Sequence, residues 1–436
     1  MKRDIQEILL KWKNNTKNRK PIILRGARQV GKSWLAKDLG NRFDDFFEIN
    51  FEKNPEFSTL FEGNFDVDEI IKNISNIFGK KIIEGQSLIF FDEIQICSKA
   101  ITALRYFYED MPNLHIIAAG SLLEFELENI SVPVGRINFI HIYPMSFAEF
   151  LTASGKAHLR DLLLKNSKEL KSLSLPLHEQ LILEVKNYTL IGGMPEVVKE
   201  FLDSNLFENC ISIQTNLLET YKSDFKKYAK NREIKYLDLL FNSVVFQIGQ
   251  KFKYSSVSTD IKSRELGKAV DLLEKAGLIY KVYHSSSNGI PLKAEINTKK
   301  FKILFFDIGL TLRLLNFNYK DLILQNDISL VNKGAVAELF TGLELCRYHD
   351  FRTTPELYYW HKEKRGSNSE VDYVIEINNV ITPIEVKSNK KGSMKSLQKF
   401  IEVKKSNVGI KISNNPYSLF NKIQTVPFYG IESLVK

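Results

Sequence analysis

The stretch GARQVGKS at residues 26–33 has the residue types and the G-x-x-x-x-G-K-[ST] spacing of a phosphate-binding loop. Glycine at both ends lets the backbone curl, so that its N–H groups face phosphate oxygens at the positive end of the next helix. Lys32 would place a cation against the β- and γ-phosphates, and the Ser33 hydroxyl would ligate Mg²⁺. We therefore expect an ATP site contacted by Gly26, Ala27, Arg28, Gln29, Val30, Gly31, Lys32, Ser33 and Trp34.

A pair of acids supplies the second half of such a site. SLIFFDEIQ at residues 87–95 is an apolar strand that ends in Asp92 and Glu93. An acid at the end of a buried strand beside the loop can hold the hydration shell of Mg²⁺, so Asp92 joins Ser33 as an expected metal residue. Glu93 is placed to orient and deprotonate the attacking water. Such a pair is often only a solvated strand end, but the nearby loop supports the catalytic interpretation.

Two further residues are weaker candidates. Ser121 ends the apolar run LHIIAAGS and is expected at the γ-phosphate or the water, although a Gly-Ser turn without a ligand fits equally well. Arg136 in PVGRIN is a candidate charge-stabilising finger, acting in its own subunit or in a neighbouring one. Most arginines only solvate a surface. The candidate catalytic residues of this region are therefore Lys32, Glu93 and Arg136.

The elements that must position these residues follow from apolar patterning. The runs PIILRG, SLIFF and LHIIAAG are bounded by turn signals, as buried parallel strands are. The run WLAKDLG after the loop favours a helix, and the first residues form an amphipathic helix with Ile5, Ile8, Leu9 and Trp12 on one face. Alternation of strands and helices to about residue 150 predicts an α/β fold.

The rest of the chain changes character twice. Residues 151–235 are rich in Leu, Lys and Glu and predict helices, interrupted by the turn GGMPE at 192–196. Residues 236–330 predict helices followed by a two-stranded wing, IYKVY and KAEIN. One of these helices has Ser263 as its expected N-cap, with Leu266, Val270 and Leu273 on one face. The last hundred residues open with the helical run GAVAELFTGLELC and continue as strands.

Length, net charge, cysteine spacing and apolar runs limit the classes of protein to which this chain can belong. A chain of 436 residues exceeds what one ordinary core supports, so two to four domains are expected. With 61 basic against 52 acidic residues the net charge is +9, which hints at a polyanion such as nucleic acid but equally fits an incidentally basic surface. The cysteines form no CxxC pair, and the charged N-terminus is not that of a signal peptide. No apolar run predicts a membrane span. We expect a cytoplasmic protein.

Together, the motifs resemble a known group of proteins. GARQVGKS, FFDEIQ, AAGS, GRINFIHIYPMSFAEF, IGGMPEVV, FFDIGL and EVDYVIEINNVITPIEVKS are similar, in this order, to segments of uncharacterised bacterial and archaeal AAA-type ATPases that couple a P-loop module to a C-terminal domain of unknown function. The resemblance implies nucleotide and magnesium roles for Lys32, Ser33, Asp92 and Glu93. It also implies a P-loop domain at 1–150, a helical linker or lid at 151–235, a winged-helix-like segment at 236–330, and at 331–436 a domain resembling the PD-(D/E)XK nuclease fold.

Counting outward from a turn predicts the register of the C-terminal hairpin. If Asn378-Asn379 form a two-residue turn, Ile377 faces Val380 and Asp372 faces Glu385. Strict alternation then separates an apolar face from a polar one. The expected apolar face carries Val371, Tyr373, Ile375, Ile384 and Val386, and the polar face carries Glu370, Asp372, Glu385 and Lys387.

The polar face admits two interpretations. Like charges directly opposite are destabilising unless something compensates them, and Mg²⁺ between Asp372 and Glu385 would do so, with Lys387 as a catalytic lysine. This D…E-x-K arrangement resembles the PD-(D/E)XK site, for which Glu338 is a candidate extra acid. The alternative is an exposed strand face with a Glu370–Lys387 ion pair. Spacing alone weighs the two about evenly.

These patterns favour an ATP- and Mg²⁺-dependent ATPase of the AAA type that drives or gates a C-terminal module acting on DNA or RNA. One alternative is a nucleotide-dependent switch whose C-terminal module binds a partner without cutting it. Another is a DNA-binding regulator that uses a basic helix. AAA relatives often supply an arginine from a neighbouring subunit, so a homo-oligomer is also expected. The basic helix carries Lys262, Arg264, Lys268 and Lys275.

Overall fold

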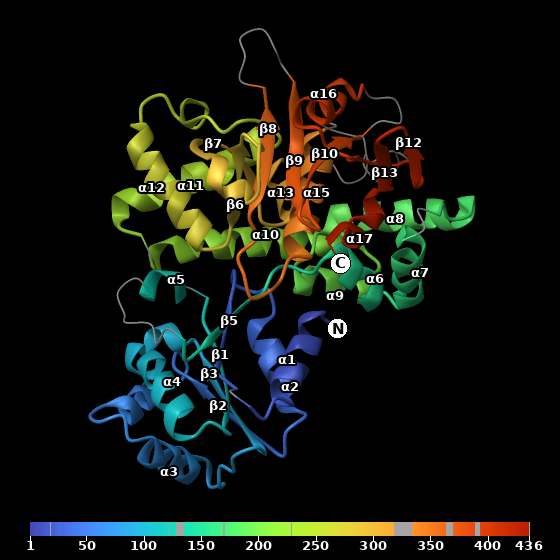
Figure 1. Ribbon diagram of the computed structural model, residues 1–436. Coiled ribbons are helices and arrows are strands. Elements are labelled where there is room, and N and C mark those ends of the chain that lie inside the picture. Colours follow the sequence, from blue (N-terminus) through green and yellow to red (C-terminus); the bar gives the residue numbers. More distant parts are fainter. Residues whose placement is uncertain are drawn as a thin grey trace. The chain divides into compact units, whose positions relative to one another are not determined.

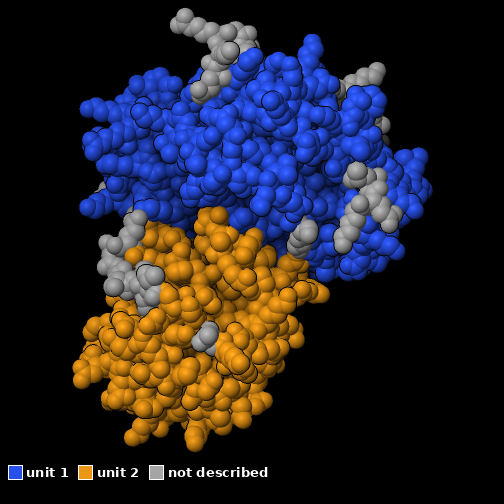
Figure 2. All heavy atoms as spheres, in the orientation of Figure 1, with its two compact units in different colours: residues 1, 144–349, 355–436 blue, residues 2–143, 350–354 orange. Residues whose placement is uncertain are grey.

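The structure is a computed structural model, shown in Figure 1. It describes residues 1–17, 19–121, 123–127, 135–168, 171–227, 229–317, 334–362, 369–388 and 393–435. The chain divides into two compact units, coloured separately in Figure 2. Unit 1 comprises Met1, Pro144–His349 and Pro355–Lys436, and unit 2 comprises Lys2–Tyr143 and Asp350–Thr354.

Unit 2 contains a five-stranded sheet in which all neighbouring strands are parallel. The three apolar runs that predicted buried strands are β1, β3 and β4, and the last two are buried at every position. The predicted parallel α/β sheet is confirmed here. In the order β2-β3-β4-β1-β5, the strands are β1 Ile22–Arg25, β2 Asp45–Asn50, β3 Ser87–Asp92, β4 His115–Ala119 and β5 Asn138–His141.

Helices lie on both sides of this sheet, with α1 and α2 on one side and α3 and α4 on the other (Figure 1). The predicted N-terminal helix forms and buries Ile5, Leu9 and Trp12. Phenylalanines of the strands, among them Phe47 and Phe91, pack with α3 and α4 in one hydrophobic cluster. The helices are α1 Ile5–Lys13, α2 Lys32–Gly40, α3 Val67–Phe78, α4 Ser98–Asp110 and α5 Leu123–Glu126, with 3-10 turns at Pro55–Phe61 and Ile94–Ile96.

Unit 1 begins with the helices that the sequence predicted after residue 150, and the GGMPE turn separates α8 from α9. Proline at the first position of α9 suits this start, because a helix needs no N–H there. The helices of unit 1 are α6 Phe147–Ala153, α7 Ala157–Lys168, α8 Leu175–Ile191, α9 Pro195–Ser204, α10 Phe207–Asp224, α11 Asn231–Ser243, α12 Ser263–Lys275, α13 Ile308–Leu314, α15 Ala335–Arg347, α16 Lys395–Lys404 and α17 Glu432–Val435.

One expected detail of α12 is wrong. Ser263 is the first residue of the helix, and the residue in the N-cap position is Lys262, which makes no side-chain capping bond. The predicted apolar face is confirmed, because Leu266, Val270 and Leu273 are all fully buried.

An eight-stranded mixed sheet forms the rest of unit 1, in the order β12-β13-β11-β10-β9-β8-β6-β7. The two strands predicted after residue 278 form the antiparallel hairpin β6–β7, although β7 starts only after a 3-10 turn at Leu292–Glu295. Because β6 also pairs with β8, the predicted boundary at 330/331 falls between strands of a single sheet. The strands are β6 Ile279–Ser285, β7 Ile296–Phe305, β8 Leu357–His361, β9 Glu370–Ile377, β10 Val380–Lys387, β11 Gly409–Ser413, β12 Ser418–Phe420 and β13 Ile423–Pro427.

The register predicted for the hairpin β9–β10 is confirmed. Val380 pairs with Ile377, and the pairing continues in step to Ile384 opposite Tyr373. Asn378 and Asn379 have φ of 50° and 61°, the left-handed values that a two-residue turn of this kind requires. Asparagine tolerates this conformation better than other non-glycine residues, which explains why a local pair fixes the register.

The predicted separation of faces is wrong in β9, because one extra residue of that strand lies opposite β8 between Val371 and Val374. Such a bulge interrupts alternation. Val371 and Val374 consequently pack in the same cluster with Phe400. The Tyr373 hydroxyl instead donates a hydrogen bond of 2.8 Å to the carbonyl of Glu338. The predicted apolar partners Val371 and Tyr373 therefore do not share one face.

Within the residues that the structure describes, no helix is long and apolar enough to cross a membrane.

Candidate nucleotide site and a buried charge cluster

The phosphate loop connects β1 to α2, and its backbone needs glycine. Gly26 and Gly31 have φ of 134° and 98°, values that side chains rarely allow. A Cβ added to Gly26 would also stand 2.1 Å from the backbone oxygen of Ile142. Arg3 fixes the loop from outside by donating a hydrogen bond of 3.1 Å to the carbonyl of Val30. The curled backbone at the start of α2 is therefore fixed by contacts within unit 2.

The other loop residues expected to contact the nucleotide differ in how far their side chains are buried. The side chains of Ala27 and Val30 lie in the core, so only their backbone can face a ligand, whereas Gln29 is exposed. Trp34 is 43% exposed on the first turn of α2.

Lys32 is 7% exposed, and its Nζ donates to the carbonyls of Gly26 at 2.9 Å and Ala27 at 2.7 Å. Burial lowers the pKa of Lys32 to about 8, while the nearby charges of Glu93 and Asp92 act in the opposite direction. The ammonium group is thus held by neutral oxygens of its own loop. A phosphate is a stronger partner for it than these carbonyls, because charge-assisted hydrogen bonds exceed neutral ones.

Ser33, in the first turn of α2, meets Asp92 at the end of β3, although β4 lies between β3 and β1 in the sheet. The Ser33 hydroxyl donates to Asp92 Oδ1 at 3.0 Å, and the amide of Asn50 donates to Asp92 Oδ2 at 3.2 Å. Burial raises the pKa of Asp92, which its bond from Ser33 partly offsets. Hydroxyl and carboxylate oxygens are ligands that Mg²⁺ prefers, so this pair fits a magnesium ion. Asn50 was not predicted as a site residue. The one feature of the sequence that could have indicated it is its position at the end of β2.

Glu93 directly follows β3 with a left-handed φ of 51°. Its Oε2 accepts hydrogen bonds from the amide of Gln95 at 2.5 Å and from the Ser121 hydroxyl at 3.4 Å. Ser121 in turn accepts from Arg28 Nε at 3.3 Å. Ser121, after β4, therefore links Glu93 at the tip of β3 to Arg28 of the phosphate loop. Gln95 was not among the expected site residues, although the DEIQ string contains it.

Arg136 lies in a different environment from the one expected of a finger. Its Nε donates to Glu109 Oε1 at 2.8 Å, and Arg105 bonds the same carboxylate. The Arg136 side chain is 44% exposed. Arg136 thus bonds Glu109, a surface acid of α4. This contact fits the alternative interpretation, in which Arg136 is a solvated surface residue.

A second constellation lies in unit 1 around Lys302 of β7. The Lys302 side chain is 1% exposed, and its Nζ lies 2.7 Å from Glu338 Oε1, 2.8 Å from Glu370 Oε1 and 4.0 Å from Asp372 Oδ1. Burial alone would lower the pKa of Lys302, but these three carboxylates raise it above its ordinary value. We call Lys302, Glu338, Glu370, Asp372, Glu385 and Lys387 the Lys302 cluster.

Glu338 comes from α15, and the other four residues around Lys302 come from the hairpin β9–β10. Asp372 Oδ2 accepts a bond of 2.8 Å from the Val386 N–H, and Lys387 Nζ lies 2.5 Å from Glu385 Oε1. The expected Glu370–Lys387 ion pair is therefore wrong: Glu370 pairs with Lys302 and with Lys251. Sequence reasoning missed Lys302, whose signal was a lysine inside the apolar run KILFF of a buried strand.

Three acids of the cluster hold protons more tightly than usual, because burial raises the pKa values of Asp372, Glu338 and Glu385. Burial raises the pKa of Glu338 to about 7, which the charge of Lys302 opposes. Burial and the charge of Asp372 raise the pKa of Glu385 to about 7. Glu385 is 5% exposed, and its Oε2 has no hydrogen-bond partner among the described residues.

The Lys302 cluster fits a divalent cation poorly. Most of its carboxylate oxygens already face an ammonium or an N–H group, and Lys302 supplies positive charge from inside the protein. Across the described parts of the chain, no group of three or more His, Cys, Asp or Glu side chains converges as metal ligands would. The expected metal residues Asp372 and Glu385 therefore share a site with an internal cation.

The helix expected to contact nucleic acid is α12. Lys268 lies 3.6 Å from Glu265 on the same helix. Lys262 precedes the helix, Arg264 is in its first turn and Lys275 ends it. The basic residues are thus spread along the helix and share it with acids.

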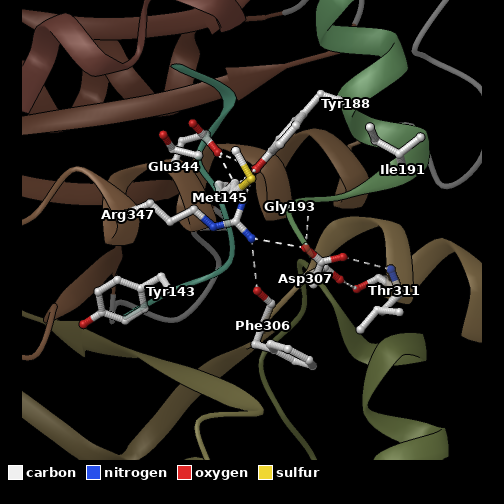
Figure 3. Close-up of polar contacts among 12 residues, drawn as sticks. Tyr143, Met145, Tyr188, Ile191, Gly193, Phe306, Asp307, Thr311, Glu344 and Arg347 are labelled. Carbon is white, nitrogen blue, oxygen red and sulfur yellow. Dashed lines mark hydrogen bonds and ion pairs between the residues drawn. The ribbon is translucent and has the colours of Figure 1, made fainter. Parts of the chain in front are cut away.

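A third group of polar residues is fully enclosed in unit 1, as the close-up in Figure 3 shows. Arg347 of α15 donates to the carbonyl of Phe306 at 3.2 Å and lies 3.5 Å from Asp307 Oδ2. Asp307 caps α13 and also accepts a bond of 2.7 Å from the Gly193 N–H in the GGMPE turn. Glu344 accepts from the Phe147 N–H at 2.9 Å. These contacts hold α6, α8, α13 and α15 together and explain the IGGMPEVV and FFDIGL segments structurally.

Three stretches of the chain match models of protein families. Residues 18–151 match the AAA domain family, residues 182–321 match a domain of unknown function, DUF8612, and residues 333–430 match another, DUF4143. The first match agrees with the loop and the acids described above. Residues 18–151 are an ATP-binding, AAA-type P-loop domain.

Curated relatives cover only part of this chain. An uncharacterized protein of Methanocaldococcus jannaschii is 27% identical over 60% of this chain, and one of Haemophilus influenzae is 27% identical over 59%. The matches span 56% and 61% of the lengths of those relatives. The Walker-type ATPase PABY2304 of Pyrococcus abyssi is similar over 72% of this chain and 95% of its own, with 17% identity and a TM-score of 0.46.

Proposed function

We propose that this protein is a Mg²⁺-dependent ATPase whose nucleotide cycle drives or gates a module in unit 1 that acts on nucleic acid. The main observation for the ATPase activity is the hydrogen bond of 3.0 Å between Ser33 and Asp92. It brings the end of the phosphate loop and the acid of β3 together. When bound there, Mg²⁺ would neutralise charge on the phosphates. Ser33 and Asp92 would hold it.

The remaining residues have separate tasks in this proposal. Lys32 exchanges the carbonyls of Gly26 and Ala27 for phosphate oxygens and stabilises the charge that develops during transfer. Glu93 orients the attacking water and accepts its proton. The carboxylate of Glu93 is within reach of the loop, because Ser121 bonds both Glu93 and Arg28.

Replacement of Glu93 tests this assignment. Glu93→Gln keeps the shape but removes the proton acceptor, so we expect ATP affinity to stay and kcat to fall by about 10²- to 10⁴-fold. Phosphate release and ATP titration by calorimetry measure the two quantities. Glu52→Gln, at an exposed acid after β2, is the matched control. Ordinary turnover in purified Glu93→Gln protein would refute the assigned role.

For unit 1, the contacts of Lys302 favour a module that binds without cutting. A nuclease of the PD-(D/E)XK kind needs its acids open to metal, and here Lys302 satisfies Glu338 and Glu370. The basic composition of the chain and the residues of α12 support nucleic acid as the partner. The module would then hold DNA or RNA in one nucleotide state and release it in another.

A divalent-dependent cleavage assay on single- and double-stranded DNA separates binding from cutting. We expect no cleavage, and an affinity for DNA that differs between ATP and ADP. Cleavage that disappears in both Asp372→Ala and Lys387→Ala would instead establish a nuclease. Cleavage unaffected by both substitutions would indicate a contaminant. An affinity that does not respond to nucleotide would refute the coupling.

A further inference from the structure

An open pocket of about 460 Å³ lies on unit 1 between α16 and the hairpin β12–β13, both labelled in Figure 1. None of its residues belongs to the candidate ATP site or to the Lys302 cluster. The hairpin closes with a two-residue turn, Asn421-Lys422, in which Asn421 has a left-handed φ of 54°. The carbonyl of Lys422 accepts a bond of 2.8 Å from the Gly409 N–H. This bond ties the turn to β11, so the wall of the pocket that the hairpin forms is a fixed one.

Phe420 forms part of this wall and is exposed to an unusual degree. Its exposed fraction is 75%, more than that of any other large apolar side chain in the described part of the chain. An exposed apolar residue that stands alone needs no explanation. Phe420, however, lines a pocket, whereas its neighbour Leu419 belongs to the other face of the strand and does not. The ring of Phe420 is therefore available to a flat ligand.

The charges around the pocket favour an anion. Lys405 and Lys422 line it and are exposed, and neither forms an ion pair with a described residue. Glu402 is the one acid among the described lining residues, and Lys399 is paired with it at 2.8 Å. The negative charge of the pocket is thus already compensated, and two ammonium groups are left for a ligand.

We infer that this pocket binds single-stranded nucleic acid, with a base stacked on Phe420 and phosphates held by Lys405 and Lys422. The inference rests on the proposed nucleic-acid role of unit 1 and adds the place of binding and the form of the strand. Proteins that hold single strands combine exposed aromatic rings with a cationic surface. The exposed amides of Gln398 and Asn421, which also line the pocket, can both donate to and accept from the edge of a base.

Other occupants match the pocket less completely. A nucleotide carries a flat base and a phosphate side by side, as the ring and the lysines require, whereas an acidic peptide side chain supplies only the charge. The bases of a duplex are stacked on one another, so Phe420 selects an unpaired strand. Strand addition by a second copy of this chain is disfavoured, because the edge strand β12 has only three residues.

Replacement of the ring tests the stacking contact. Fluorescence anisotropy of the full chain, with Mg²⁺ and either ATP or ADP, measures affinity for labelled oligothymidylate of about 12 nucleotides and for duplex DNA of equal length. We expect Phe420→Ala to weaken single-strand binding by about 5- to 100-fold and duplex binding by less than about two-fold. Phe420→Trp should keep the affinity, and the strand should quench its emission by more than it quenches that of the wild type. Leu419→Ala, exposed on the same strand, is the matched control.

Replacement of the lysines tests the phosphate contacts. Lys405→Gln and Lys422→Gln should each lower the slope of log affinity against log salt concentration by about 0.7, because one phosphate contact is lost from a single strand. Lys299→Gln, at an exposed position of β7, should leave the slope unchanged.

The outcomes separate this inference from the proposal beneath it. Single-strand binding that is unchanged in Phe420→Ala, or equally weakened in Leu419→Ala, would overturn the pocket as the site and leave the proposed function standing. No binding of either DNA by the wild type, with ATP or with ADP, would overturn the nucleic-acid role and this inference together. Displacement of the strand by polyglutamate as readily as by unlabelled oligothymidylate would show that only charge is recognised, which also contradicts the inference.

Two further measurements guard the interpretation. Light scattering that shows a wild-type dimer and a Phe420→Ala monomer with unchanged DNA affinity would make the pocket an interface between copies, against the inference. Thermal unfolding shows whether each variant is folded. If Phe420→Ala is unfolded, the quenching of Phe420→Trp and the salt slope of Lys422→Gln still decide the question.

Discussion

Two regions of this molecule place a buried lysine beside carboxylates, but the lysines have different partners. In unit 2, Lys32 Nζ is bonded to the main-chain carbonyls of Gly26 and Ala27. In unit 1, Lys302 Nζ is bonded to the carboxylates of Glu338 and Glu370. Burial is the largest influence on both lysines, yet the pKa of Lys32 is lowered to about 8 while that of Lys302 is raised.

The difference shows which lysine can receive a ligand. Neutral carbonyls can give up an ammonium group to a phosphate with little loss, because they gain other partners or water. Carboxylates that lose a buried ammonium become uncompensated charges, which is strongly unfavourable. We therefore expect Lys32 to bind a phosphate, whereas Lys302 is already the counter-ion of its own cluster.

The largest effect is expected at Lys32. Lys32→Ala removes two charge-assisted hydrogen bonds to phosphate, so ATP affinity should fall by about 3–6 kcal/mol, or at least about 100-fold. Calorimetric titration with ATP and Mg²⁺ measures it. Lys72→Ala, at an exposed lysine of α3, is the matched control. If Lys32→Ala binds ATP as tightly as the wild type, the inferred difference between Lys32 and Lys302 is wrong.

The next effect concerns stability. Lys302→Met keeps most of the side-chain volume but leaves Glu338 without its cation and Glu370 with Lys251 alone, so unit 1 should lose about 3–5 kcal/mol of unfolding free energy. Urea denaturation at pH 8 measures the loss. Lys299→Met, at an exposed position of the same strand, controls for removal of a charge. A loss below about 1 kcal/mol, typical of surface pairs, would show that Lys302 is not an essential counter-ion.

Acidification should weaken unit 2 through His115. Burial lowers the pKa of His115 to about 4, and its Nε2 lies 3.0 Å from the carbonyl of Lys13. The unfolded chain binds a proton near pH 6.5 that the folded one refuses, so stability falls as pH drops from about 6.5 toward 4. Between pH 7 and 5 the loss from this group should reach about 2 kcal/mol.

Trp12 reports on this transition, because its ring lies 5.5 Å from that of His115. Urea unfolding followed by Trp12 fluorescence, with Trp34 and Trp360 replaced by Phe, should show the loss. In His115→Gln the difference between pH 7 and 5 should shrink by this amount. An unchanged difference would mean that another group causes it.

The smallest effect has the opposite dependence on pH. Because the pKa of Glu385 is raised to about 7, its folded form binds a proton that the unfolded form releases above about pH 4.5, and stability falls as pH rises through this window. Glu385→Gln should therefore stabilise unit 1 by about 1–2 kcal/mol at pH 8 and by less at pH 5. Thermal unfolding at both pH values checks this. A stabilising effect of Mg²⁺ that is present in wild type but lost in Glu385→Gln would instead identify a metal site.

Local signals explain what could be predicted from the sequence. Gly26 and Gly31 define a loop of eight residues, and Asn378-Asn379 define a hairpin turn. The phosphate loop and the hairpin register could therefore be predicted from residues that are close in sequence. The proximity of Asp92 to Ser33 followed from a parallel sheet, whose strand ends meet at one edge.

The features that could not be predicted depend on contacts between residues far apart in the sequence. The bulge at Val371–Val374 arises from pairing with β8, and Lys302 reaches Glu338 and Glu370 from a strand that no motif marks. Gln95 stood in a recognised string, but its side chain lies against Gly120, which follows β4, the next strand of the sheet. Partner strands decide such details, and a single sequence does not identify them.

Calorimetric titration of the wild-type protein with ATP in the presence of Mg²⁺ tests the account most directly. We expect one ATP per chain, with the heat abolished in Lys32→Ala and kept in Lys72→Ala. No heat in the wild type, or equal heat in Lys32→Ala, would contradict the claim that the loop at residues 26–33 binds nucleotide.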